Sequence, residues 1–311
     1  MKNLVIREND TVNTYFMTHS GIFHADEVMA TVILIKRFGN IRVRRTFKVP
    51  EKFSELKLFD GTLPIVYDIG GGKYDHHQRG GNGCRENGVP YASAGLIWRD
   101  FGRDVSPDTC PNKELVWSLV DRDLIQGIDA IDNGAMPSAD YACKAMSISG
   151  VISSFNPTWN SSKSSDDCFE EAVEFAERIF DNVLESAMSK AEAEAVVETA
   201  IAEAAEGIMV LPYFVPWQEF VFSSENPKAK ELLYVVFPSN RGGYNMQCVP
   251  VSLGSFASRK VLPENWCGLP ASELQAVTGV ATVTFCHNNG FMAATQTQED
   301  AIKLAKLAAE A

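Results

Sequence analysis

Short apolar segments alternate with longer amphipathic segments through the first half of the chain. The short segments are rich in β-branched and aromatic residues, which favour strands, and the longer ones show the apolar spacing of helices. The predicted strands are 14–18, 41–47 and 64–69, and the predicted helices are 25–38, 93–102 and 113–131. Alternation of this kind is typical of βαβ units. The first half therefore predicts an α/β fold with a mainly parallel sheet.

A long helical pattern follows. Residues 166–206 contain neither glycine nor proline, and apolar residues recur there at helical spacing. One unbroken helix of this length would span roughly 60 Å at ~1.5 Å per residue, so we expect a break or a connecting role. After Gly207 the pattern returns to short strands punctuated by prolines. We predict a first domain at 1–165, a long acidic connecting helix at 166–206 and a smaller α+β domain at 207–311.

Composition is typical of a soluble globular protein with two domains. Of the 311 residues, 45% are hydrophobic, and the formal net charge is −12. No apolar run reaches the ~18 residues of a membrane span, and residues 1–10 lack a targeting pattern. We therefore expect a cytoplasmic protein without a membrane partner. The seven cysteines form no CxxC pair and are expected to be reduced thiols.

The negative charge is concentrated on the predicted connecting helix. Residues 166–206 carry 13 acidic and 2 basic side chains, whereas 1–165 carry 19 of each and 207–311 carry 8 and 7. The net charge therefore does not exclude a nucleic-acid partner. It predicts that such a partner is bound locally by a few basic residues and not by a broad basic surface.

Four of the five histidines lie in two short segments, THSGIFHADE and YDHHQR, and each segment follows a predicted strand. Ligands of an open α/β sheet gather beyond the carboxyl ends of its strands, which places both segments at one edge. Imidazole together with carboxylate is the ligand mixture that Mn²⁺, Fe²⁺, Co²⁺ and Zn²⁺ prefer. The candidate metal-site residues are His19, His24, Asp26, Asp68, Asp75, His76 and His77.

Single members of this set have simpler interpretations. Asp26 and Glu27 fit the first turn of a helix, where the helix dipole favours acids, and Asp75 fits a turn. The joint pattern favours a metal site. The chain has no P-loop, GxSxG or HExxH motif, and Cys84 has no evident partner for nucleophilic catalysis.

Seven short segments carry a resemblance to a known family. In chain order they are 18–27 (THSGIFHADE), 66–68 (VYD), 74–79 (YDHHQR), 90–98 (PYASAGLIW), 128–134 (IDAIDNG), 255–263 (SFASRKVLP) and 285–291 (FCHNNGF). They closely resemble the melanocyte proliferating gene family, a branch of the DHH phosphoesterase superfamily. The resemblance spans nearly the whole chain in the family's order.

The resemblance implies a DHH-type phosphoesterase domain with two divalent metal ions. The implied ligands are His19, His24 and Asp68 for one ion, and Asp26, Asp68, His76 and either Asp129 or Asp132 for the other, with Asp129 favoured. His24 stands where the wider superfamily has an aspartate. This additional nitrogen ligand shifts the expected metal toward Mn²⁺ and away from Mg²⁺.

The resemblance also implies a 3′–5′ exonuclease that acts on RNA or short oligonucleotides through a metal-activated water. The implied catalytic residues are Asp75, His77 and Arg79, and the implied substrate-binding residues are Arg259, Lys260 and His287. Arg259 and Lys260 are also interpretable as an exposed basic pair, and the glycine-rich segment 80–88 as a lid or a plain surface loop.

Two alternative functions stay open at this point. One is a phosphatase or pyrophosphatase of small nucleotides, and the other is a metal-bound RNA-binding protein without turnover. A homodimer is compatible with the sequence.

Overall fold

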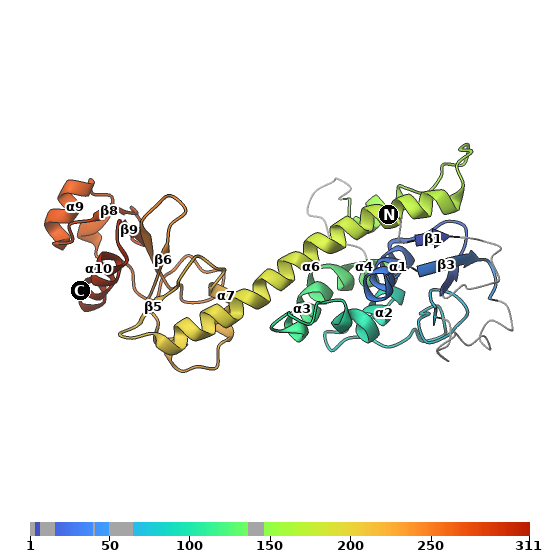
Figure 1. The fold of residues 1–311 in the computed structure, drawn as a ribbon, viewed down its shortest axis with the longest axis horizontal. Helices are drawn as coiled ribbons and strands as arrows, with labels where there is room; N and C mark the ends of the chain where they lie inside the picture. The colour runs from blue at the N-terminus through green and yellow to red at the C-terminus, as the bar shows by residue number, and fades with distance from the viewer. Residues whose placement is uncertain (1–3, 7–15, 40, 50–64, 136–145) are drawn as a thin grey trace. The chain divides into compact units, whose positions relative to one another are not determined.

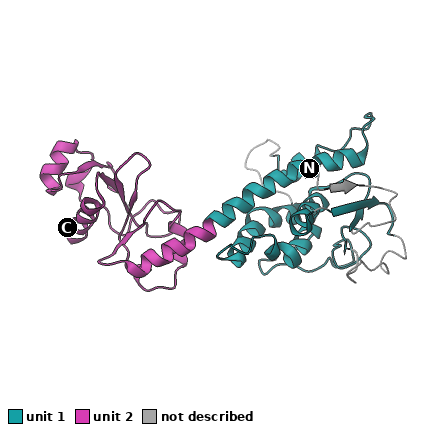
Figure 2. Cartoon of the chain, in the orientation of Figure 1, with its two compact units in different colours: residues 1–189 teal, residues 190–311 magenta. Residues whose placement is uncertain are grey.

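The computed structural model of the chain describes residues 4–6, 16–39, 41–49, 65–135 and 146–311. Thr14 and Pro64, with which two of the predicted strands begin, lie outside the described residues. The chain divides into two compact units, residues 1–189 and 190–311 (Figure 2).

Unit 1 contains a four-stranded sheet in the order β1-β3-β2-β4, and all three strand pairs are parallel (Figure 1). Its strands are β1 (Leu4–Ile6), β2 (Phe16–His19), β3 (Ile41–Thr46) and β4 (Ile65–Val66). Ile41, Val43 and Arg45 of β3 are buried, and the residues between them are half-buried. The α/β class with a mainly parallel sheet is thereby confirmed.

Helix α1 is buried from Ala25 to Ile35 and packs against α2, α4 and α5. An almost unbroken apolar sequence suits a helix that is covered on most sides. The helices and helical turns are α1 (Ala25–Phe38), α2 (Ser93–Phe101), η2 (Gly102–Asp104), α3 (Lys113–Val120), η3 (Asp121–Ile125), α4 (Gln126–Asp132) and α5 (Ile148–Ser153). The predicted helix at 113–131 is therefore interrupted by a π-helical turn, η3.

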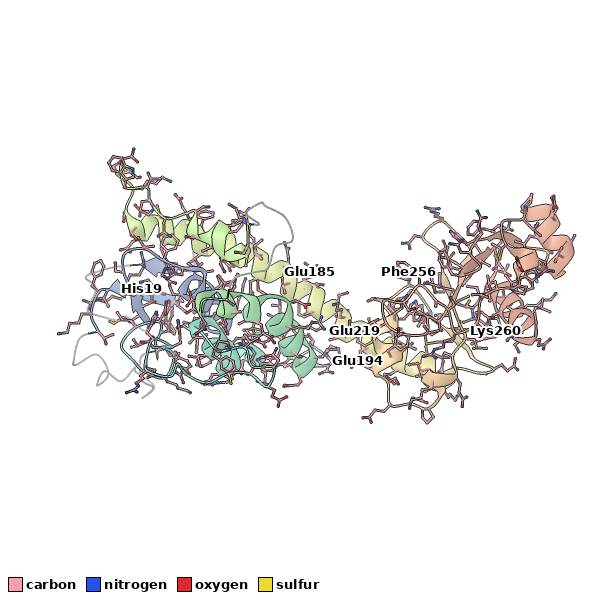
Figure 3. All side chains as sticks on the ribbon, turned by 180° about the vertical axis from the view of Figure 1, so that it is seen from behind. His19, Glu185, Glu194, Glu219, Phe256 and Lys260 are labelled. Atoms are coloured by element: carbon pink, nitrogen blue, oxygen red, sulfur yellow. The ribbon has the colours of Figure 1, made fainter. Side chains whose placement is uncertain are left out.

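Helix α6 (Ser165–Glu203) is continuous over 39 residues, so the break that its length suggested does not occur. The boundary between the two units lies within it. Phe169, Val173 and Phe180 form part of its buried apolar stripe, while Glu185 and Glu194 are among its acidic side chains (Figure 3). Within the described part of the chain, no helix is long and apolar enough to cross a membrane.

Unit 2 is built on a mixed five-stranded sheet in the order β5-β6-β7-β9-β8, in which only β5 and β6 are parallel. Its elements are β5 (Ile208–Val210), α7 (Gln218–Ser223), α8 (Lys228–Glu231), β6 (Tyr234–Pro238), β7 (Tyr244–Cys248), η4 (Glu264–Trp266), α9 (Ala271–Thr278), β8 (Val283–Cys286), β9 (Met292–Thr295) and α10 (Gln298–Glu310). Its core joins buried residues of α10 to Val236 and Met246 of the sheet.

Candidate metal centre

The first histidine segment connects the end of β2 to the start of α1. His24 is the N-cap of α1, and the Glu27 carboxylate accepts a hydrogen bond from its main-chain N–H at 3.0 Å. This contact is half of a capping box. Oε1 of the same carboxylate lies 2.8 Å from Nε2 of His19, the last residue of β2. Glu27 is fully buried, and it brings His19 and His24 together as a group that could hold a cation.

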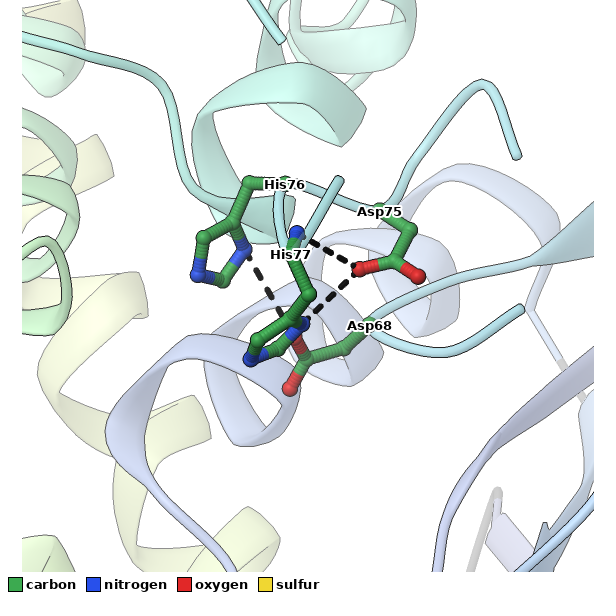
Figure 4. Close-up of side chains that lie close together, drawn as sticks. All are labelled: Asp68, Asp75, His76 and His77. Atoms are coloured by element: carbon green, nitrogen blue, oxygen red, sulfur yellow. Dashed lines mark hydrogen bonds and ion pairs between the residues drawn. The ribbon is translucent and has the colours of Figure 1, made fainter. Parts of the chain in front are cut away.

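Asp68 lies just beyond β4 and contacts both histidine segments; Figure 4 shows it beside His76 and His77 of the second segment. Its Oδ2 is 3.3 Å from His19 Nε2, and its Oδ1 is 3.4 Å from His77 Nδ1 and 3.6 Å from His76 Nδ1. The Ser93 hydroxyl donates to the same Oδ1 at 3.2 Å. Asp68 adopts a positive φ of 56°, a strained conformation that aspartate tolerates better than most residues.

His76 joins two further carboxylates. Its Nε2 lies 2.9 Å from Asp132 Oδ2, and its Nδ1 lies 3.7 Å from Asp26 Oδ2. The Asp26 carboxylate also accepts hydrogen bonds from the main-chain N–H groups of Ser93 and Ala94, at 2.8 and 2.6 Å. These N–H groups begin α2, where the helix dipole favours an anion. Asp26, His76 and Asp132 form a second group that could hold a cation.

Asp75 orients His77 (Figure 4). Its Oδ1 accepts from the main-chain N–H of His77 at 3.0 Å and lies 2.8 Å from the ring Nδ1, while Oδ2 accepts from Gly71 N–H at 2.6 Å. Burial alone would raise the pKa of Asp75, but these hydrogen bonds outweigh burial and lower it. The His77 side chain is 61% exposed. The Asp75 contacts hold Nδ1 and leave Nε2 for other partners.

Several acids of this site are buried close to one another, and this shifts their pKa values. Burial raises the pKa of Asp26 well above its usual value, and repulsion from Asp68 and Asp132 raises it further. Burial also raises the pKa of Glu27. For His19, burial lowers the pKa, but hydrogen bonds to Asp68 and Glu27 outweigh it and raise the value to about 10. Buried carboxylates that repel one another, mixed with imidazole nitrogens, fit divalent cations chemically.

Asp129 and Asp132 have different partners. Asp129 is buried, and its carboxylate accepts from Arg85 Nη1 at 2.8 Å and from Gly95 N–H at 3.0 Å. A Cβ at Gly95 would collide with that carboxylate, so the glycine leaves room for the Asp129 side chain next to α2. The resemblance favoured Asp129 over Asp132 as a metal ligand. The geometry favours Asp132, because it contacts His76 whereas Asp129 is held by Arg85.

A family model described as "Uncharacterised protein family (UPF0160)" and labelled MYG1_exonuc matches residues 15–309. The "MYG1 protein YER156C" of Saccharomyces cerevisiae is 31% identical over 97% of this chain and 97% of its own length. The "MYG1 exonuclease" of Mus musculus is 30% identical over 93% of this chain and 83% of its own length.

The chain belongs to the MYG1 family. This confirms the family predicted from the motifs, whereas the wider DHH phosphoesterase grouping stays a prediction. The "MYG1 exonuclease" of Homo sapiens is 29% identical over 93% of this chain and 84% of its own length. No solved structure matches the chain.

Three residues that the family resemblance implied as substrate contacts lie in unit 2 (Lys260 in Figure 3). The Arg259 guanidinium donates to three main-chain carbonyls around the end of α8, the closest being Ala229 O at 2.7 Å. Lys260 Nζ donates to Ala309 O at 2.7 Å. His287 Nδ1 accepts from a main-chain N–H two residues on, at 3.1 Å. Arg259 and Lys260 thus hold carbonyl groups within unit 2, which favours a structural role for both.

Arg79 is exposed, and its guanidinium has no ion-pair partner in the part of the chain that the structure describes. Arg85, in contrast, belongs to the glycine-rich segment 80–88 and binds Asp121 with two hydrogen bonds, of 2.8 and 2.6 Å, in addition to Asp129. The segment is therefore anchored at its centre. Sequence patterns did not single out Arg85.

Glu27 was also missed as a site residue. A glutamate at the third position of a helix is explained by capping alone, so its contact with His19 had no separate signal in the sequence. The only available hint was the sequence HADE, which places two acids two and three residues after His24.

Proposed function

We propose that this MYG1-family protein is a metal-dependent 3′–5′ exonuclease that acts on RNA or short oligonucleotides. The observation that carries the proposal is the position of the buried Asp68 carboxylate, which reaches three histidines from two separate segments. Relatives named "MYG1 exonuclease" support the reaction class.

Two neighbouring cation positions follow from the contacts around Asp68. We assign His19, His24, Glu27 and Asp68 to one cation, and Asp26, Asp68, His76 and Asp132 to the other. The first set is rich in imidazole, which favours Mn²⁺ over Mg²⁺. Asp68 is shared because its two oxygens face different histidines.

Two divalent cations would supply an activated water and charge neutralisation for phosphodiester hydrolysis. The chain's own groups position the phosphate. His77, fixed through Nδ1 by Asp75, presents its Nε2 to a phosphoryl oxygen. Arg79 adds a positive charge three residues C-terminal to His76. The N–H groups of Ser93 and Ala94 hold Asp26 in place through the cycle.

The test is digestion of a 5′-labelled oligoribonucleotide by the full chain with Mn²⁺, in parallel with a small phosphodiester and with pyrophosphate. We expect a ladder of products shortened from the 3′ end, loss of activity on dialysis against a chelator, and recovery on adding Mn²⁺. Turnover of pyrophosphate alone would instead support a small-nucleotide phosphatase. Metal binding without any turnover would support a binding protein.

The site assignment is tested by Asp68→Ala and His76→Ala. Both variants should lose metal and activity while remaining folded, as judged by circular dichroism. Asp108→Ala is the matched control, because its carboxylate is fully exposed in the same unit and, among the residues that the structure describes, pairs only with Lys113. Full turnover by either site variant contradicts the assignment.

A further inference from the structure

The sheet of unit 2 has one face in the core and one open face. Met246, Ala293 and Val236 lie in the core with α10. Register pairs connect the alternate positions across four strands: Phe237 of β6 pairs with Asn245 of β7, Asn245 with Ala294 of β9, and Ala294 with Phe285 of β8. Because side chains alternate between faces along a strand, these residues share the face opposite the core.

A groove of about 670 Å³ lies over this row, which is within the usual size range of small-molecule sites. Phe214 packs beside Phe237 with ring centroids 5.2 Å apart, yet it is 54% exposed. Phe285 is 42% exposed. Two aromatic side chains thus line the same groove and remain accessible to a ligand.

The polar side chains of the groove are available for binding. Asn240 and Arg241 belong to the turn between β6 and β7, and Asn245 lies on the sheet. Their side chains form no hydrogen bond or ion pair with any residue in the described ranges. The turn itself is ordered by main-chain hydrogen bonds, with Ser239 N–H donating to Gly243 O at 2.9 Å. The main chain of the turn is therefore held in place, and the side-chain donors that it carries have no partner in the described ranges.

The charge of the groove opposes that of the chain. Arg241 is the only charged residue that lines it, and no acid does, whereas the whole chain carries a net charge of −12. The Arg241 cation can bind an anion, and exposed phenylalanine rings can stack on a flat ring system. Free side-chain amides can form hydrogen bonds with the polar edge of such a ring. A nucleotide combines all three properties.

We infer that this groove binds a nucleotide of a single-stranded oligonucleotide. The base stacks on Phe285, the amides of Asn240 and Asn245 contact its edge, and Arg241 pairs with the phosphate. The inference relies on the proposed nuclease function for the choice of ligand. It adds a binding subsite in unit 2 that is separate from the metal-site residues of unit 1.

Binding is measured by fluorescence anisotropy with the full chain and a 5′-fluorescein decauridylate that carries phosphorothioate linkages. Phe285→Ala should weaken binding on the order of tenfold, as expected for the loss of one stacked base. Phe285→Leu, which keeps an apolar side chain without the ring, should weaken it as well. Arg241→Gln should weaken binding and reduce its salt dependence.

Phe256→Ala is the matched control, because this phenylalanine is also in unit 2 and is fully exposed but does not line the groove (Figure 3). It should bind the probe like the unaltered chain. If Phe285→Ala and Arg241→Gln also bind normally, the inference is wrong. Equal displacement of the probe by oligoglutamate would show recognition of charge alone and would also contradict it.

A second assay separates this inference from the proposed function. Mn²⁺-supported hydrolysis of glycerophosphocholine, a phosphodiester without rings, needs the metal centre but offers no ring to stack on Phe285. Its rate should be unchanged in Phe285→Ala. If the unaltered chain hydrolyses neither this compound nor RNA, the proposed nuclease function fails, and the anisotropy results still decide whether the groove binds nucleotides.

Discussion

Asp129 and Asp132 lie three residues apart on α4, yet their carboxylates belong to different networks. Asp132 Oδ2 lies 2.9 Å from His76 Nε2, whereas Asp129 binds the buried Arg85 and Gly95 N–H. A carboxylate already satisfied by a guanidinium and an amide stabilises the fold, and one beside an imidazole can share a cation. We therefore propose that Asp132 binds a metal ion and that Asp129 stabilises the fold.

Asp132→Asn should lower the metal content of the purified protein and its nuclease activity, with little change in unfolding temperature. Asp129→Asn should destabilise the fold by about 1.5–3 kcal/mol, because it weakens charged hydrogen bonds to Arg85. Metal analysis and urea unfolding of the two variants provide the measurement. The opposite pattern, in which only Asp129→Asn loses metal, would restore the assignment that the resemblance favoured.

The histidines and Asp68 could be anticipated because polar residues that follow predicted parallel strands gather at one edge of a sheet. The choice between Asp129 and Asp132 could not. The π-helical turn Asp121–Ile125 precedes both, and one extra residue per turn rotates every later side chain by about 100° relative to an α-helical projection. Apolar periodicity predicted one continuous helix there and so carried no information about this rotation.

At the scale of elements, side chains from distant parts of the chain form hydrogen bonds with the segment between β2 and α1. The Asn156 amide accepts from Phe23 N–H at 2.9 Å and donates to Phe23 O at 2.8 Å, as a neighbouring strand would. Arg45, fully buried on β3, donates to Gly21 O at 2.8 Å and pairs with Asp166 of α6 at 2.7 Å. The position of His24 therefore depends on elements that are distant in sequence.

Asn156→Ala should weaken Mn²⁺ binding, because both main-chain contacts of Phe23, next to His24, are lost. The loss of two hydrogen bonds should also cost about 1–3 kcal/mol of stability. Titration calorimetry on the metal-free protein measures the first effect and thermal unfolding the second. Asn160→Ala, an exposed asparagine nearby, should leave both unchanged. Unaltered Mn²⁺ affinity in Asn156→Ala would show that the contact supports only the fold.

Local patterns predicted α1 and α2 well, since both helices begin and end close to the expected residues, whereas the predicted helix 113–131 is interrupted by η3. They could not reveal the contacts made by Asn156 or Arg45, because a single polar side chain has no periodicity. The aromatic groove of unit 2 was also hidden, since only the register of four strands places Phe237 and Phe285 on the same face of the sheet.

For the whole molecule, the distribution of charge limits how an oligonucleotide is bound. The acidic side chains of α6, including Glu185 and Glu194, repel phosphate groups, so this helix cannot form part of a broad basic surface. Among the residues that line the groove, Arg241 is the only charged one. Each phosphate contact to a single strand contributes about −0.7 to the slope of log K against log salt concentration. With few contacts, binding should depend mainly on stacking and only weakly on salt.

The affinity for fluorescein-labelled decauridylate is measured over a range of NaCl concentrations. A plot of log K against log salt concentration should have a slope of about −1.4 to −2.1, which corresponds to two or three phosphate contacts. In Arg241→Gln the magnitude of this slope should fall by about 0.7. Phe285→Ala should lower the affinity but leave the slope unchanged. A slope steeper than about −4 would require six or more phosphate contacts. Such a value would contradict local binding, because the groove offers one cation and the rest of the chain has an excess of acids.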